Sequence, residues 1–415
     1  MPGPEVPGAA LGEVPPRPGG SGVAFRAPDR RPRTPKRRPG IMIFQFFNTE
    51  RSVRDMSHAA KKGTGPAADR QERLKVSISL CETAITLFGV NTRDYYFNAD
   101  TMADVEARFW ERFRPDGASI SITLRGMAEA MGSVISYKNH CIPSVETPRV
   151  REPKDVYGLR VPDPLKDGRL PIVLNALVKL RKRLDGKIAV GAGMAGPVSV
   201  AIAVCGAENF LRWTRRHPEE IKHMMDIIVE GNNRYIDELG KRGIVGLSFS
   251  DPVASTDLLG YKQFLEFSLP YFTANVRYGG KVLGKNPGTH ICGHTKGIWK
   301  DIVGSGVSSF SIDNVEDLAE AKEIMGDSIA IIGNVPPVNV LNLGGEEDIR
   351  RSVAECILKG HDSPKGYALG SGCQVPLFTP AENIDAYIRW GKELGKLPID
   401  VERLQRIAAG EEGAA

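Results

Sequence analysis

Two cysteines and one histidine in the second half of the chain have the residue types and the spacing of a metal site. His290 and Cys292 are two residues apart, and on a β-strand such side chains point to the same face. Cys373 follows a second short apolar run about eighty residues later and is preceded by Gly372. One imidazole and two thiolates suit Zn²⁺, and three protein ligands leave the fourth tetrahedral position open. The pattern therefore predicts a zinc site of the catalytic kind.

The fourth position has three weaker protein candidates, and the triad itself has a plainer interpretation. His294 lies on the face of His290 and Cys292 if the strand continues through Gly293. Asp251 and Glu266 are the other candidates. The plainer interpretation is a core histidine beside two buried cysteines, because free cysteine packs as a small hydrophobic residue. Cys81, Cys141, Cys205 and Cys356 are predicted to be packed in that way.

Other polar and glycine residues also follow apolar runs. Asp313 and Asp251 are the candidate catalytic residues. We expect Asp313 to bind polar groups of a substrate or help a proton move, to cap a helix that begins near Val315, or to do both. Asn334 either lines a cavity or turns the chain. Met194 and Gly196 lie in the glycine-rich stretch 191–197, where a strand end approaches a ligand or simply turns. That stretch is no dinucleotide fingerprint, because the G-x-G-x-x-G order runs into proline.

These candidates fall at the ends of predicted strands in an alternating pattern of strands and helices. Strands are predicted over 117–124, 188–191, 245–249, 307–312, 329–332 and 367–369, and within 281–291. Helices are predicted over 72–90, 100–113, 126–131, 171–184, 218–238, 261–271, 295–303, 315–325, 346–358 and 380–394, with an irregular excursion over 133–170. Repeated strand–helix units imply a parallel sheet, and this number favours an α/β fold of the (β/α)₈ TIM barrel type. The carboxyl ends of the barrel strands form the active-site rim.

The first 40 residues differ in composition from the rest of the chain. Residues 1–40 contain ten of the 29 prolines and eight Lys/Arg against three Asp/Glu, whereas the remainder is formally neutral. We therefore expect residues 1–70 to be a disordered extension and linker, and residues 71–410 to form the barrel. The neutral remainder gives no reason to expect a nucleic-acid partner, and no apolar run is long enough to predict a membrane span. Scattered cysteines without disulfide-like spacing favour the cytoplasm.

The motifs resemble those of a known family. They are Ser250-Asp251-Pro252, residues 264–271, His290-Ile291-Cys292-Gly293, Ser311-Ile312-Asp313, Gly333-Asn334-Val335, and Ser371-Gly372-Cys373 followed by residues 379–383. Over about residues 75–400 the chain resembles the uroporphyrinogen decarboxylase superfamily, and more specifically its corrinoid-dependent methyltransferase branch. The resemblance implies a (β/α)₈ barrel and assigns zinc to His290, Cys292 and Cys373. The arginine-rich signature that holds substrate carboxylates in the decarboxylases is absent here.

The resemblance implies methyl transfer between a corrinoid, carried by a partner protein, and a small-molecule thiol or methyl donor. A metal-bound thiol is deprotonated and stays nucleophilic, which suits attack on a methylated corrinoid. The reverse direction, with a methylated compound as donor, is equally compatible with the motifs. Two alternatives remain: a uroporphyrinogen decarboxylase of tetrapyrrole biosynthesis, and a non-catalytic zinc- or corrinoid-binding protein. An open ligand position disfavours the non-catalytic alternative, because structural zinc usually has four protein ligands.

Overall fold

The computed structural model describes residues 72–80 and 82–412, and its centre is one parallel β-sheet. Eight strands follow one another in the order β1-β10-β9-β8-β7-β6-β5-β2, and every neighbouring pair is parallel. Their bounds are β1 Lys75–Val76, β2 Ala118–Ser121, β5 Val190–Ala195, β6 Gly246–Ser250, β7 Gly288–His290, β8 Ser309–Ser311, β9 Ala330–Val335 and β10 Tyr367–Ser371.

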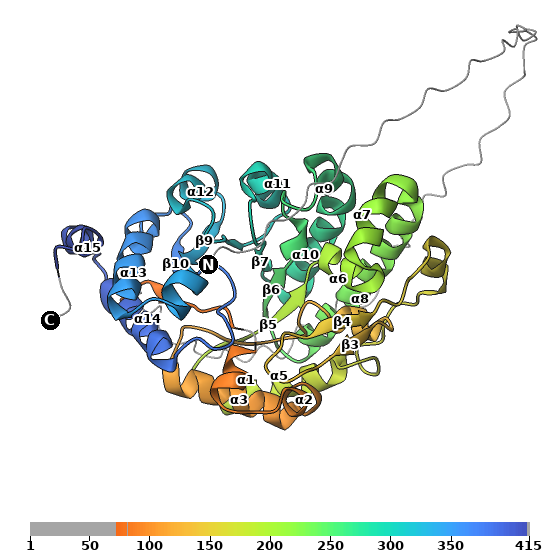
Figure 1. Ribbon diagram of the computed structural model, residues 1–415, viewed down its shortest axis with the longest axis horizontal. Helices are drawn as coiled ribbons and strands as arrows, with labels where there is room; N and C mark the ends of the chain where they lie inside the picture. The colour runs from red at the N-terminus through yellow and green to blue at the C-terminus, as the bar shows by residue number, and fades with distance from the viewer. Residues whose placement is uncertain (1–71, 81, 413–415) are drawn as a thin grey trace, which may run out of the picture. The chain divides into compact units, whose positions relative to one another are not determined.

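The two end strands of this order are joined through Asp116, which lies shortly before β2. The amide of Val76 in β1 donates to the Asp116 carboxylate at 2.7 Å, and the amide of Asp116 donates to the Val76 carbonyl at 2.9 Å. The strands therefore curl into a barrel inside a ring of helices (Figure 1). The predicted (β/α)₈ barrel is confirmed.

The helices alternate with the strands along most of the chain. Their bounds are α1 Thr83–Leu87, α2 Thr92–Phe97, α3 Ala99–Phe113, α4 Gly126–Ala130, α5 Leu170–Arg183, α6 Pro197–Cys205, α7 Ala207–Arg216, α8 Pro218–Lys241, α9 Tyr261–Phe267, α10 Leu269–Leu283, α11 Trp299–Gly304, α12 Leu318–Met325, α13 Glu346–Gly360, α14 Ala381–Leu394 and α15 Val401–Ala408. Within the described residues, no helix is long and apolar enough to cross a membrane.

Helix α3 shows how local sequence sets these elements. The Asn98 side chain accepts hydrogen bonds from the amides of Asp100 and Thr101, at 2.9 and 3.1 Å, and so caps the helix. Met102, Val105 and Phe109 then recur at helical spacing and are buried. The helix therefore begins one residue before the predicted start and covers the barrel with one apolar face.

The helix predicted over residues 72–90 is wrong. This segment contains strand β1 and the short helix α1, which begins only at Thr83. Val76, Ile78 and Leu80 alternate with polar residues, which is the period of a strand. Strand β1 is so short because only Lys75 and Val76 pair with β10, opposite Ala368 and Leu369. The apolar residues of this segment also fit a helix, and pairing with the distant strand β10 determined that part of it forms a strand.

Three further regions depart from the sequence prediction. Helices α6 and α7 were not predicted, since the α6 sequence is rich in valine and reads as a buried strand. The helix predicted over 261–271 is two helices, α9 and α10, which meet at Ser268. The excursion over 133–170 contains an antiparallel hairpin of β3 Val134–Ser136 and β4 Ser144–Thr147. The extension predicted over residues 1–70 lies outside the described residues.

Candidate metal centre

His290 is the last residue of β7, and its ring is oriented by the neighbouring strand β8. Its Nδ1 lies 3.0 Å from the carbonyl oxygen of Ser311 and 3.2 Å from the Ser311 hydroxyl. A carbonyl oxygen only accepts, so Nδ1 carries the proton and donates it to Ser311. Nε2 is then the unprotonated nitrogen, and it lies 3.1 Å from Sγ of Cys292. A ring fixed in this way presents its lone pair as a metal ligand does.

Cys373 reaches the same point from β10, which is three strands away in the sheet. The chain leaves β10 at Ser371, and the amide of Gly372 donates to the carbonyl of Val335 at the end of β9. Gly372 also packs on Asn314 beyond β8, where an added Cβ would lie 2.6 Å from backbone. The segment therefore crosses the ends of β9 and β8, and it places Sγ of Cys373 3.2 Å from Sγ of Cys292.

The three predicted ligands are thus together and have the chemistry that zinc requires. The donor atoms of His290, Cys292 and Cys373 all lie within 4.8 Å of one another, and all three residues are partly buried. Zinc–sulfur and zinc–nitrogen bonds are about 2.3 and 2.1 Å long, so ligands on one tetrahedron lie roughly 3.5–3.8 Å apart. The observed separations, 3.1 Å between His290 Nε2 and Cys292 Sγ and 3.2 Å between the two sulfurs, are close to that spacing. The donor set therefore fits a tetrahedral Zn²⁺ with one position left for a substrate.

The electrostatics of the two thiols favour one thiolate. The hydrogen bond from Cys292 lowers the pKa of Cys373 to about 5. The same hydrogen bond, together with burial, raises the pKa of Cys292. Metal binding requires both sulfurs as thiolates. The proton of Cys373 is readily lost, because its pKa is low, whereas the metal must displace the proton of Cys292.

The weaker candidates for a fourth ligand are engaged elsewhere. The exposed His294 ring pairs through Nδ1 with Asp257 at 2.9 Å. Glu266 forms an ion pair with Lys222 at 3.3 Å. Asp251 faces helix α6, as described below. Neither these residues nor another described His, Cys, Asp or Glu joins the group of three.

Asp251 is buried at the end of β6 and binds the first turn of helix α6. One oxygen accepts from the amide and hydroxyl of Ser199, at 2.8 and 2.6 Å, and the other from the amide of Val198 at 3.3 Å. Gly196 permits this approach, because a Cβ there would lie 2.3 Å from the carboxylate. Asp251 therefore anchors a helix N-terminus, where negative charge is favourable. Its predicted catalytic role stays a prediction.

The charge state of Asp251 gives a pH-dependent stability. Burial raises its pKa to about 6, although hydrogen bonds from Ser199 and Val198 lower it. In the unfolded chain an aspartate titrates near pH 3.9, so between about pH 4 and 6 the native state holds a proton that the unfolded state has lost. We expect the contribution of this group to the free energy of unfolding to fall by about 2–3 kcal/mol as pH rises from 4 to 7. Urea unfolding of wild type and Asp251→Asn across this pH range measures this contribution. A difference in free energy of unfolding between the two proteins that stays constant with pH contradicts the prediction.

Asp313 and Asn334 lie beside the metal group but use their polar atoms within the protein. Asp313 accepts from the amides of Gly293 and Val315, at 2.9 and 3.1 Å. It is not the predicted helix cap, because α12 begins at Leu318 and is capped by Asp317. The Asn334 amide donates to the carbonyls of Asp313 and Glu316. The catalytic role predicted for Asp313 and the substrate contact predicted for Asn334 stay predictions.

The remaining sequence predictions have mixed outcomes. Met194 is buried within β5, and Gly196 lies under Asp251; the substrate contacts predicted for both stay predictions. Cys205 and Cys356 are buried as predicted, whereas Cys141 is exposed and the prediction for it is wrong. Cys141 lies between the strands of the β3–β4 hairpin, where no core covers it. Cys81 lies outside the described residues.

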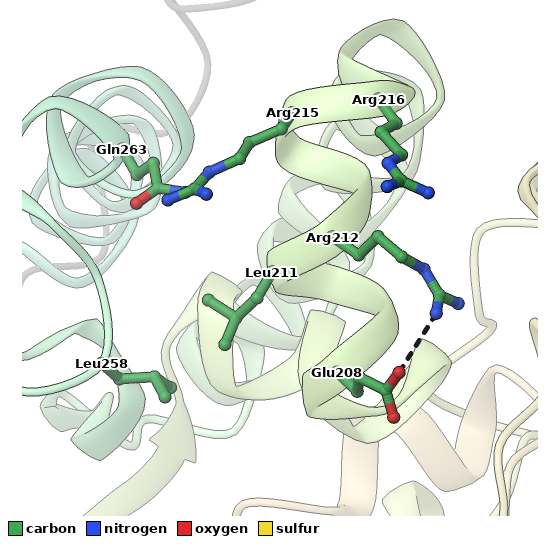
Figure 2. Close-up of a pocket in the computed structure, with 7 residues that line it drawn as sticks. All are labelled: Glu208, Leu211, Arg212, Arg215, Arg216, Leu258 and Gln263. Atoms are coloured by element: carbon green, nitrogen blue, oxygen red, sulfur yellow. Dashed lines mark hydrogen bonds and ion pairs between the residues drawn. The ribbon is translucent and has the colours of Figure 1, made fainter. Parts of the chain in front are cut away.

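A surface pocket of about 470 Å³ lies between α7 and α9, apart from the metal group. In Figure 2, Leu211 and Leu258 face one another across it, and Arg215 extends toward Gln263. Arg212 pairs with Glu208 at 3.1 Å. None of the three proposed metal ligands lines this pocket. The pocket is therefore separate from the candidate metal centre.

Two carboxylates near the metal group, Asp257 and Glu316, were not predicted from the sequence. Asp257 lies between β6 and α9, and Glu316 lies between β8 and α12. Both are in loops that follow barrel strands. This position was the sequence signal that could have marked them as candidate site residues. The predicted helix start at Val315 concealed Glu316, because an acidic residue in a first helical turn needs no further explanation.

Comparisons with known proteins show which family the chain resembles. The uroporphyrinogen decarboxylase (URO-D) family model matches residues 68–394. A methylated-thiol–coenzyme M methyltransferase of Methanosarcina mazei is 30% identical over 72% of this chain and 78% of its own length. A methylcobamide:CoM methyltransferase, MtaA, of Methanosarcina barkeri is 29% identical over 70% and 84%. A uroporphyrinogen decarboxylase of Mannheimia succiniciproducens is 24% identical over 72% and 86%.

A solved structure supports the barrel fold. A methyltransferase from Methanosarcina mazei superimposes with a TM-score of 0.69 at 24% identity, over 77% of this chain and 94% of that one. At this identity the likeness concerns the barrel. Because the family model covers most of the chain, from before β1 to the end of α14, the chain belongs to the uroporphyrinogen decarboxylase (URO-D) family.

Proposed function

We propose that this chain is a zinc-dependent methyltransferase, which moves a methyl group between a corrinoid and a small-molecule thiol or methylated compound. The observation that carries the proposal is the group of His290, Cys292 and Cys373 at the barrel rim, with donor atoms within 4.8 Å. The relatives described above as methyltransferases match at higher identity than the decarboxylase does. Both findings support methyl transfer over decarboxylation.

The residues of the chain prepare this site for a thiol substrate. His290 offers Nε2 because Ser311 accepts the proton on Nδ1. Cys292 and Cys373 supply sulfur, and the lowered pKa of Cys373 makes one thiolate available at neutral pH. Zn²⁺ bound by these three residues would supply an open Lewis-acid position, at which a substrate thiol loses its proton. The three residues lie at or just after the ends of barrel strands, the face at which substrates bind in this fold.

The methyl transfer itself is a displacement between the two substrates. The substrate sulfur attacks the methyl group of a methylated corrinoid, a carbon–sulfur bond forms, and the methyl–cobalt bond breaks. Its electron pair stays on cobalt, which leaves as Co(I), and the thiol proton passes to solvent. The same site, run in reverse, transfers a methyl group from a methylated compound to Co(I). We propose that the corrinoid is carried by a partner protein.

A reducing compartment suits this site. The sulfurs of Cys292 and Cys373 lie 3.2 Å apart, so an oxidant would join them in a disulfide and remove two of the three ligands. We therefore propose a cytoplasmic location, where thiols are kept reduced.

An assay with free methylcobalamin tests the proposed function. Zinc-loaded protein is mixed anaerobically with methylcobalamin and a thiol panel that includes coenzyme M, and loss of the methyl-Co(III) absorbance is followed. We expect thiol-dependent demethylation that a strong chelator abolishes and added Zn²⁺ restores. Porphyrinogen decarboxylation that survives the chelator, without demethylation, would instead support the decarboxylase alternative. Stoichiometric metal or corrinoid binding without turnover would support the non-catalytic one.

A further inference from the structure

Four consecutive backbone amides follow the proposed ligand Cys292, and each donates to a carboxylate. The amide of Gly293 donates to Asp313 at 2.9 Å, and that of His294 to Asp257 at 2.8 Å. The amides of Thr295 and Lys296 both donate to one oxygen of Glu316, the latter at 2.8 Å. Hydrogen bonds to ionised acceptors are roughly twice as strong as neutral ones. Residues 293–296, which we call the metal loop, are therefore held at every amide.

The carboxylates that hold the metal loop are themselves fixed to the barrel. Asp313 and Glu316 belong to the loop between β8 and α12, and Asn334 at the end of β9 donates to the carbonyls of both residues, at 3.1 and 2.8 Å. Asp257 belongs to the loop after β6. The metal loop after β7 is thus tied to the loops after both neighbouring strands, and through Asn334 to β9.

Gly293 is the residue that makes this arrangement possible. Its φ is +76°, a left-handed conformation that favours glycine. A Cβ at this position would also lie 2.3 Å from the carboxylate of Asp257. The chain therefore turns sharply directly after Cys292, and its amides face the surrounding carboxylates.

Ordinary capping explains only part of this network. Asp317 alone accepts from the amides of Ala319 and Glu320 at the start of α12, so neither Asp313 nor Glu316 is needed there. Glu316 does cap the short helical turn that begins at Lys296. Capping of that turn does not require Asp313, which binds the residue adjacent to Cys292.

We propose that Asp313 and Glu316 are positioning residues of the metal centre. They hold the metal loop so that Sγ of Cys292 stays in reach of His290 and Cys373 in a single geometry. This inference rests on the metal site of the proposed function. It gives Glu316 a role that the sequence did not suggest. Asp313, which the sequence suggested as a catalytic residue, acts here by positioning the metal loop and not by contact with the reacting atoms.

The test compares Glu316→Ala with Glu320→Ala in the full-length protein. Glu320 is a matched control, because it lies in the same region and binds the exposed side chain of Lys296, at 2.7 Å, instead of a backbone amide. Zn²⁺ affinity is measured by competition with a chromophoric chelator. The Co(II)-loaded proteins are then compared by their thiolate charge-transfer and d–d absorption bands, which report the coordination geometry.

We expect Glu316→Ala to bind Zn²⁺ about 10–100-fold more weakly, the range for loss of groups that orient metal ligands. Its Co(II) bands should shift or broaden, and Glu316→Gln, which keeps an acceptor oxygen, should recover most of the affinity and the spectrum. Glu320→Ala should match wild type in both measurements. A folded Glu316→Ala protein with wild-type affinity and wild-type bands overturns the role of Glu316.

Asp313→Ala provides the second variant, in case Glu316→Ala does not fold. It removes the hydrogen bonds from Gly293 and Val315 and should also weaken Zn²⁺ binding and alter the Co(II) bands. Wild-type behaviour of this variant overturns the role of Asp313. These readouts need no methyl transfer. A wild-type protein that binds metal but demethylates no corrinoid therefore refutes only the proposed function, whereas methyl transfer with unaltered metal binding in both variants refutes only this inference.

Discussion

Replacing Cys373 with serine is expected to remove zinc and methyl transfer together. Serine keeps the size of the side chain, but its hydroxyl stays protonated at neutral pH and is a poor ligand for Zn²⁺ beside one thiolate and one imidazole. Only Cys292 and His290 would remain of the donor group. We expect metal content to fall from about one zinc per chain to near zero, and turnover by more than about 100-fold, beyond the effect of losing an outer partner.

Metal content by mass spectrometry and demethylation of methylcobalamin measure this prediction. Cys141→Ser is the matched control, because it makes the same replacement at an exposed thiol outside the donor group, and it should retain both zinc and activity. Full turnover by metal-free Cys373→Ser would refute the zinc mechanism. Absence of zinc from freshly purified wild type, with none taken up on addition, would refute the metal site as a whole.

Replacing Gly196 with alanine is expected to destabilise the barrel. The backbone of Gly196 is extended, with φ −70° and ψ 163°, so alanine introduces no backbone strain. The added Cβ would instead lie 2.3–2.5 Å from three atoms of the Asp251 side chain. Relief of this overlap must displace a buried carboxylate from the amides of Ser199 and Val198. Overpacking and broken buried hydrogen bonds together cost about 2–4 kcal/mol.

Urea unfolding followed by circular dichroism measures the loss, as a lower midpoint with an unchanged slope. Gly117→Ala is the control, because no atom lies within 4 Å of a Cβ at Gly117 and its φ is not positive. That variant should be neutral or slightly more stable, by up to about 1 kcal/mol. Equal midpoints for the two variants would show that Gly196 is not required for the approach of Asp251.

The sequence was most informative where a strand ends in polar residues. Asp251, Asp313 and Cys373 follow strands β6, β8 and β10, and His290 is the last residue of β7. A parallel sheet brings such strand ends to one edge. The barrel and the composition of the donor group could therefore be predicted. The region from residue 72 to residue 90 could not, because a strand of two paired residues leaves almost no periodic signal and its pairing with β10 is a contact between distant parts of the chain.

The partners of each polar residue were the least predictable feature. Asp251 and Asp313 have the residue type and position of catalytic acids, but both accept backbone hydrogen bonds, Asp251 from the first turn of α6 and Asp313 from the loop after β7. A carboxylate at a strand end is compatible with either role, and only the path of the neighbouring loops decides between them. Glu316 was missed for the same reason, since its bonds to Thr295 and Lys296 join loops that are separate in the sequence.

The sequence by itself determined the fold class, the edge of the barrel that carries the candidate metal site and the identity of its three soft donors. These follow from local periodicity and residue type, which are properties of short segments. Only the tertiary structure decided which nitrogen of His290 faces the sulfurs, how the chain after β10 crosses β9 and β8 to deliver Cys373, and which carboxylates hold the loop after Cys292. Those features depend on distances between segments that are remote in sequence, and such distances are set when the barrel closes and its loops pack against one another.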